Sequence, residues 1–106
     1  MAKVHVDAGI CGFHTDVEAV SEDGQMVTVT VKSACPHVMK FAETLAAEGE
    51  LDAYGEIFCA YGKNKVTEAA VHLKHVVCIV PTGVLKAIEV ACELALPKEA
   101  SLRIEK

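Results

Sequence analysis

The sequence predicts an α+β fold in which a mainly antiparallel, four-stranded sheet is covered on one face by helices. Apolar and polar residues alternate over the first third of the chain, which is typical of strands with one buried face. Apolar residues then recur at helical spacing, and Pro and Gly stand where several of these segments begin and end. The predicted order is β-β-β-α-α-α-α-β, within a single domain of residues 1–106.

The first three strands are predicted to form an antiparallel meander. Val4 and Val6 alternate with polar residues in the first strand. A second strand is expected at Phe13–Val20 and a third at Gln25–Ser33, each with one apolar face. The Asp23-Gly24 pair between them favours a tight hairpin, because it supplies the positive φ angles that such turns require.

Four helices and a closing strand are predicted to follow the meander. Each helix is indicated by an apolar stripe at helical spacing. The expected helices are Pro36–Glu48, Leu51–Phe58, Asn64–Lys74 and Pro81–Ala95. In Ala100–Glu105, Leu102 and Ile104 alternate with polar residues, which predicts the fourth strand of the sheet.

Composition excludes several classes of function. The 106 residues are 52% hydrophobic and have a net charge of −5, and no basic cluster is present that would bind phosphates. No signal peptide is evident, and every apolar run is far shorter than the roughly 20 residues of a membrane span. We therefore expect a cytoplasmic protein that binds neither nucleic acid nor membranes, and whose five cysteines are reduced at rest.

The cysteines are the strongest functional signal in the chain. Cys11, Cys35 and Cys78 lie beside Gly or shortly before Pro, where a turn or a helix begins. At a helix start, free backbone N–H groups and the helix dipole stabilise a thiolate, which is the form that binds metals. The meander topology also places Cys11, in the first turn, at the same end of the sheet as Cys35, just past the third strand.

These positions predict a soft-metal site. Thiolates favour iron–sulfur clusters and zinc, and we expect an iron–sulfur cluster first and zinc as the alternative. The predicted ligands are Cys11, Cys35 and Cys78, with Cys59 as a possible fourth. If only three cysteines meet, the site is exposed or bridges two chains, so a homodimer or a protein partner is expected. Each cysteine has a competing interpretation as a small core residue, and this is the one we adopt for Cys92, on an apolar helix stripe.

Two other functions remain open. In the first, Cys35 is the nucleophile of a thiol redox protein or sulfur carrier and Cys11 resolves it, with His37 as a proton partner. His75, in the series H-x-x-H-x-x-C, is a further candidate ligand. In the second, the chain is a non-catalytic interaction module with packing cysteines. The sequence leaves open whether the protein is an enzyme, although its small size and few acid–base residues favour a carrier, assembly or electron-transfer role.

The chain resembles a small, uncharacterised protein family of anaerobic prokaryotes. The similarity rests on Ala8–Phe13 (AGICGF), Cys35 before the first long helix, Cys78–Pro81 followed by Gly83–Ala91, and Leu94–Lys98. The resemblance spans nearly the whole chain and implies the cytoplasm of an anaerobe. It places Cys11, Cys35 and Cys78 in recognised segments, and it implies no activity.

Overall fold

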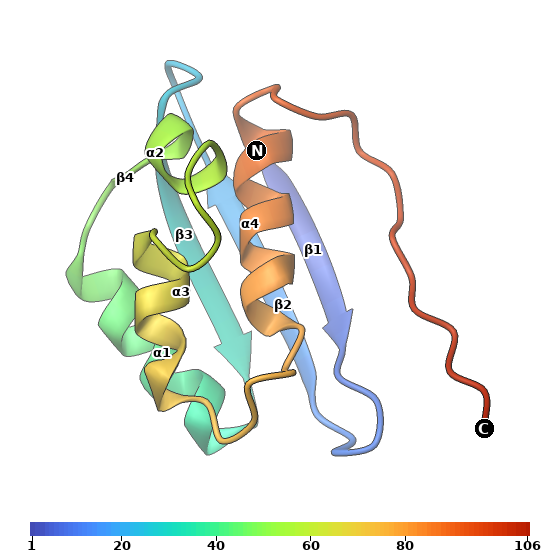
Figure 1. The fold of residues 1–106 in the computed structure, drawn as a ribbon. Helices are drawn as coiled ribbons and strands as arrows, with labels where there is room; N and C mark the ends of the chain where they lie inside the picture. Colours follow the sequence, from blue (N-terminus) through green and yellow to red (C-terminus); the bar gives the residue numbers. More distant parts are fainter.

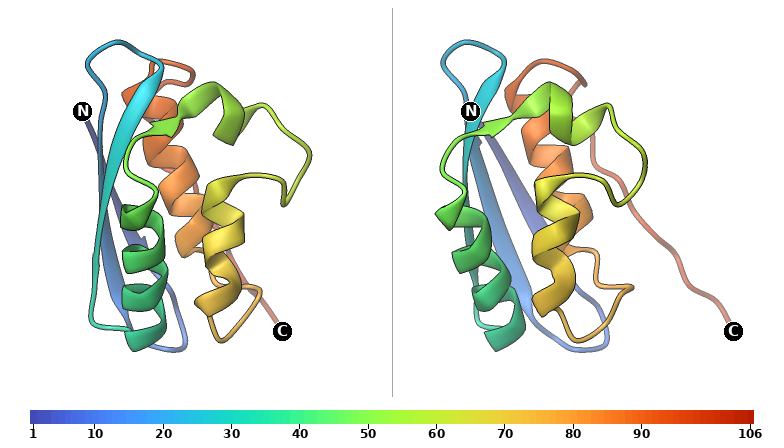
Figure 2. Two further views of the ribbon diagram at one scale, coloured as in Figure 1. Left: turned by 90° about the vertical axis from the view of Figure 1, so that its left-hand side faces the viewer. Right: turned by 60° about the vertical axis from the view of Figure 1, so that its left-hand side comes forward.

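A sheet of four antiparallel strands forms one layer of the molecule, and helices pack against one of its faces (Figures 1 and 2). The computed structural model describes all residues from Met1 to Lys106. The strand order is β1-β2-β3-β4. The elements are β1 (Ala2–Asp7), β2 (His14–Val20), β3 (Met26–Ser33), α1 (Pro36–Ala47), β4 (Leu51–Asp52), α2 (Ala53–Ile57), α3 (Lys65–Ala69), the 3-10 turn η1 (Ala70–His72) and α4 (Val80–Ala91). The predicted α+β class and antiparallel sheet are confirmed.

The three-stranded meander has the predicted buried faces. Val4 of β1 lies opposite Val17 of β2, and Val17 lies opposite Val31 of β3. Side chains of a strand alternate between the two faces of the sheet, so this row of valines continues across the face that the helices cover. Val17 is fully buried, whereas Val4 and Val31 lie nearer the margins of the core.

The hairpin between β2 and β3 is held by its Asp-Gly pair. Gly24 has a φ of 79°, as the sequence predicts. The carboxylate of Asp23 accepts hydrogen bonds from the N–H groups of Gln25 and Met26, both at 2.9 Å. These bonds hold the pKa of the Asp23 carboxyl below its ordinary value, because they stabilise the charged form.

Two long helices supply most of the second layer. Helix α1 packs against β3, and α4 packs against β1 and β2. Phe41 of α1 and Ile88 of α4 are the largest fully buried side chains, and both belong to a single hydrophobic core of sheet and helix residues. None of the helices has the length and apolar character that a membrane-spanning segment needs.

The fourth strand is not the one predicted. Ala100–Glu105 is exposed and pairs with no strand, so that prediction is wrong. The fourth strand is instead Leu51–Asp52, which pairs with Met26–Val27 of β3. A turn at Gly49, with a φ of 70°, returns the chain from α1 to the free edge of β3. Two residues are too few to show the alternation by which strands are recognised.

The later helices are shorter than predicted. The helix expected from Leu51 starts at Ala53, because Asp52 caps it with a hydrogen bond from the N–H of Tyr54. The helix expected over Asn64–Lys74 is α3 followed by η1, and the chain is extended at Leu73. The last helix begins one residue early and ends at Ala91 instead of Ala95, because Glu93 turns the backbone to a φ of 58°.

Candidate functional site

Three loops lie at the end of the sheet where β1 stops and β2 starts, the lower end in Figure 1. They are residues 8–13, residues 34–35 and residues 73–79, and we call this region the cysteine end. The first two are brought together by strand pairing, because Asp7 lies opposite His14 and Thr15 lies opposite Ser33. Cys11 and Cys35 therefore lie at the same end of the sheet, as the meander topology predicts.

A hydrogen-bond network ties the backbone at Cys35 to the sheet. The Ser33 hydroxyl oxygen accepts hydrogen bonds from the Thr15 hydroxyl, at 2.9 Å, and from the N–H of Cys35, at 3.1 Å. The same hydroxyl lies 3.5 Å from the carbonyl oxygen of His14, to which it donates. Thr15 is 1% exposed, so this polar pair is sheltered from water on the core side. The network fixes where the chain leaves β3 and enters α1.

Cys35 is the N-cap residue of α1. Its backbone is extended, with φ −72° and ψ 121°, and Pro36 follows as the first helical residue. The Cys35 side chain forms no capping hydrogen bond with the helix. Its thiol is half-buried against the core and remains available for another partner. His37 follows in the first turn of α1, and its side chain is exposed to solvent.

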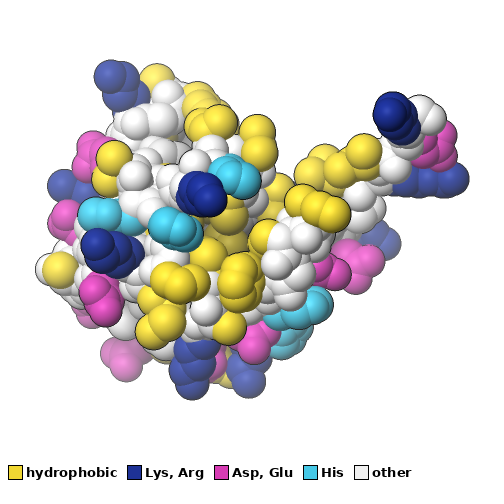
Figure 3. All heavy atoms as spheres, turned by 90° about the horizontal axis from the view of Figure 1, so that it is seen from below, with side chains coloured by type: hydrophobic (Ala, Val, Ile, Leu, Met, Phe, Trp, Pro, Cys, Tyr) yellow, Lys and Arg dark blue, Asp and Glu magenta, His cyan; other side chains and the backbone are white.

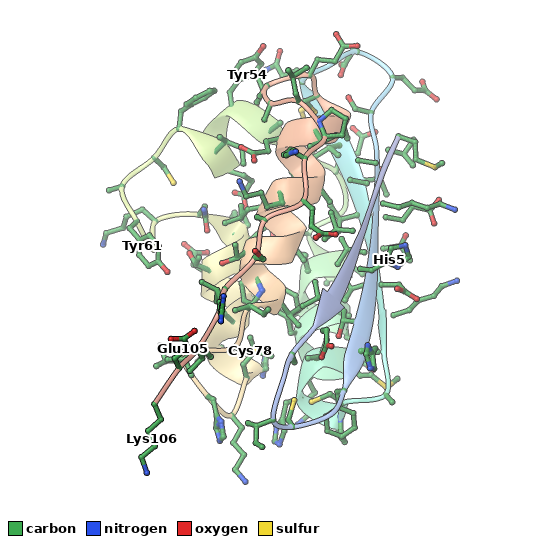
Figure 4. All side chains as sticks on the ribbon, turned by 90° about the vertical axis from the view of Figure 1, so that its right-hand side faces the viewer. His5, Tyr54, Tyr61, Cys78, Glu105 and Lys106 are labelled. Atoms are coloured by element: carbon green, nitrogen blue, oxygen red, sulfur yellow. The ribbon has the colours of Figure 1, made fainter.

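Cys78 lies directly before the cap of α4 (Figure 4). Its N–H donates to the carbonyl oxygen of His75 at 3.1 Å, which closes the turn that leads into the helix. The first turn of α4 lies tightly on β1, because a Cβ added at Gly83 would be 2.5 Å from Cγ2 of Val6. Since Val6 is next to the end of β1, this close approach brings the start of α4 to the cysteine end. Cys78 is half-buried against the core, as Cys35 is.

The other two cysteines lie elsewhere. Cys59 is exposed in the connection between α2 and α3, where its thiol donates a 3.7 Å hydrogen bond to the carbonyl oxygen of Glu56. The structure therefore does not bring it to the loops that hold the other three. Cys92 caps the far end of α4, about 18 Å along a 12-residue helix from its start. It is buried in the core, as predicted.

The cysteine end also presents histidines and apolar side chains to solvent (Figure 3). His14 opens β2, His72 ends η1, and His75 lies on the loop before α4. The segment from His72 to Cys78 is not helical beyond η1, so the three-residue spacing does not align these side chains on a helix face. The exposed apolar residues of the same loops are Ile10, Val76 and Val77.

Within one chain, no three His, Cys, Asp or Glu side chains lie close enough together to hold a metal ion. The three loops thus bring thiols to the same end of the molecule without assembling a complete ligand set. Cys11 is exposed, and Cys35 and Cys78 are partly so. Cys11 is therefore open to groups from outside the chain, whereas Cys35 and Cys78 also pack against the core.

A second polar feature, absent from the predictions, is a buried carboxylate. Glu56 is 5% exposed, and its two oxygens accept hydrogen bonds from the N–H groups of Lys65, at 2.9 Å, and Val66, at 2.8 Å. Its carbonyl oxygen accepts another from the Asn64 side chain at 2.8 Å. Glu56 therefore anchors the start of α3. The only signal in the sequence is Asn64, a typical helix cap, and nothing there indicates that Glu56 is its partner.

Glu56 also borders a hollow on the surface. The hollow has a volume of about 230 Å³ and lies between the end of α1, β4, α2 and the start of α3. Acidic residues make up half of its lining, beside Lys63 and Lys65. It contains no cysteine, and its lining acids Glu48 and Glu50 are exposed to solvent.

The fold and the site define a small two-layer α+β protein with accessible thiols on loops at one end of its sheet. The chain belongs to a family of unknown function, DUF6951, whose model matches residues 2–104. This agrees with the resemblance noted from the sequence. No curated protein and no solved structure matches the chain.

Proposed function

We propose that this protein binds a soft metal ion or an iron–sulfur cluster through the thiolates of Cys11, Cys35 and Cys78. The observation that supports the proposal is the placement of these cysteines on three separate loops at the cysteine end. Thiolates are the preferred ligands of iron–sulfur clusters and are common ligands of zinc. A carrier, assembly or electron-transfer role follows from such a site on a small protein.

In this proposal the site bridges two chains. One chain does not bring three ligands within reach of one ion, so a second chain supplies the remaining thiolates. The cysteine end suits such an arrangement, because Ile10, Val76 and Val77 are exposed around it and would be covered at an interface. Burial of these side chains would also exclude water from the thiolates. The histidines of this end are available as further ligands.

The test is the metal content of protein purified without oxygen and without a metal-affinity tag. Iron, acid-labile sulfide and zinc are measured per chain, together with the absorption spectrum and the molar mass in solution. We expect stoichiometric iron and sulfide and broad visible absorption. Stoichiometric zinc without colour would identify the metal as zinc.

Single Cys→Ser variants assign the ligands. Changes at Cys11, Cys35 and Cys78 should each lower the metal content, whereas Cys59→Ser is the matched control, because Cys59 is an exposed thiol on another segment. Unchanged metal content in all three variants, or metal-free wild-type protein, would overturn the proposal. Loss of metal in Cys59→Ser would show that the ligand set extends beyond the cysteine end.

The structure also favours a second candidate, a thiol redox protein in which Cys35 is the nucleophile. Its thiol has no capping bond at the start of α1, and Cys11 lies at the same end of the sheet to resolve it. This function predicts rapid alkylation of Cys35 at neutral pH and a Cys11–Cys35 disulfide after oxidation with diamide, both read by mass spectrometry. Slow alkylation, or a disulfide with other partners, would contradict it.

A further inference from the structure

The C-terminal segment is an exposed arm with the pattern of a strand. Every residue from Leu96 to Lys106 is exposed and outside regular structure, and Leu102 and Ile104 are 76% and 90% exposed. Ala100, Leu102 and Ile104 alternate with polar residues, which is typical of a strand with one buried face. The family match extends to residue 104, so this segment is part of the region that the family shares.

Strand β1 forms an open edge of the sheet, and its residues alternate between an apolar and a polar face as those of the arm do. Strand β1 is at the margin of the sheet and pairs only with β2, so its other side presents unpaired backbone N–H and C=O groups. Ala2, Val4 and Val6 point into the core, while Lys3 and His5 are exposed on the opposite face. A further strand on this edge would therefore need apolar residues on one side and polar residues on the other.

The charges of the arm are complementary to those of β1 in a parallel register. With the arm parallel to β1 and Leu102 beside Val6, Glu99 lies beside Lys3 and Arg103 lies beside Asp7. Ala100 then lies beside Val4 and extends the core face. A shift of two residues that moves Ile104 beside Val6 puts Glu105 next to Asp7, which is a repulsive pair.

We propose that the arm, residues 98–105, adds as a fifth strand to β1 of a second copy of the chain, and that the two copies exchange arms. In its own chain the arm leaves α4 after the turn at Glu93 and passes on the helical side of the molecule, away from β1 (Figure 4). An arm that projects from a molecule with an open, complementary edge favours reciprocal exchange, which closes as a two-fold dimer. Exchange covers the β1 edge of both sheets, places Leu102 beside Val6 and brings Ile104 just past the end of β1.

The exchange does not depend on the proposed metal, so it is tested on protein freed of metal by a chelator and kept reduced. Sedimentation equilibrium of the full chain should show a dimer. Two variants should be monomers that stay folded: a chain that ends at Pro97, and Leu102→Ser/Ile104→Ser. They should stay folded because the Leu102 and Ile104 side chains are exposed in the single chain. Leu96→Ser is the matched control, since Leu96 is exposed but precedes the pairing segment.

Charge reversal tests the register. Lys3→Glu and Glu99→Lys should each raise the dimer dissociation constant by about threefold to tenfold, because each copy then contains a like-charged pair. The double variant should restore the wild-type value. A full chain that is monomeric would overturn the proposal, and hydrogen-exchange protection of residues 99–104 in that monomer would show that the arm pairs with its own β1. A dimer unaffected by Leu102→Ser/Ile104→Ser would also overturn it.

Discussion

Removal of the Glu56 carboxylate should be among the most damaging single changes in this protein. Its two oxygens accept hydrogen bonds from the N–H groups of Lys65 and Val66 at 2.9 and 2.8 Å, and the residue is 5% exposed. A hydrogen bond to a charged group contributes about 1.5–3 kcal/mol, so two bonds set an upper range of about 3–6 kcal/mol. Water can reach the start of the short α3 once the side chain is gone. We therefore expect Glu56→Ala to lower the free energy of unfolding by about 3 kcal/mol.

Equilibrium urea unfolding followed by circular dichroism measures this loss. If the slope is about 1.5 kcal/mol/M, the unfolding midpoint of Glu56→Ala falls by about 2 M. Glu56→Gln should lose less, because its amide oxygen can still accept one of the two bonds. Glu43→Ala is the control, since Glu43 is an exposed acid on α1, and its effect should stay within about 0.5 kcal/mol. A loss below about 1 kcal/mol for Glu56→Ala would refute the anchoring role derived from these contacts.

Three further changes have defined outcomes. Gly83→Ala should lower the free energy of unfolding by about 1–3 kcal/mol, because the new Cβ would clash with Val6, and Val6→Ala in the same chain should recover part of the loss. Ser33→Ala should cost about 1–3 kcal/mol, because it leaves the buried Thr15 hydroxyl without its acceptor. An NMR titration should place the pKa of Asp23 below 3.8. The charged Asp23 carboxylate therefore stabilises the folded protein at pH values above its unfolded-state pKa. This stabilisation should be lost as the pH falls through the lower folded-state pKa.

Each of these predictions has a matched control. Gly55→Ala should be well tolerated, because the nearest atom to its new Cβ is 3.6 Å away. In Thr15→Val/Ser33→Ala, both partners of the buried bond are removed, so the double variant should lose less stability than the sum of the single changes. Asp23→Asn should abolish the acid titration assigned to this turn. Equal effects of Gly83→Ala and Gly55→Ala would contradict the close packing of α4 on β1.

The meander was predictable because its signals are local. Alternation in β2 and β3 assigns the buried face, and Asp23-Gly24 marks the turn that connects the two strands. The same reasoning correctly placed Cys11 and Cys35 at the same end of the sheet. The start of α1 was equally predictable from the sequence, because Pro36 is the first helical residue.

The later half was harder because its structure depends on distant partners. Leu51–Asp52 is a strand only because the edge of β3 is free beside it, and two residues cannot show a period. Ala100–Glu105 has the alternation of a strand, but within the chain nothing pairs with it. The Glu56 carboxylate accepts hydrogen bonds from backbone N–H groups nine and ten residues away, and no sequence pattern predicts such a contact.

The placement of α4 has a consequence for how the chain folds during synthesis. This helix is the last element to leave the ribosome, yet it covers β1 and β2, which leave first. Until residues up to Ala91 are free, the apolar face that includes Val6 and Val17 lacks its cover, so the nascent meander exposes a sheet face prone to association. Completion of the core therefore waits for contacts between the two ends of the sequence, which favours slow folding.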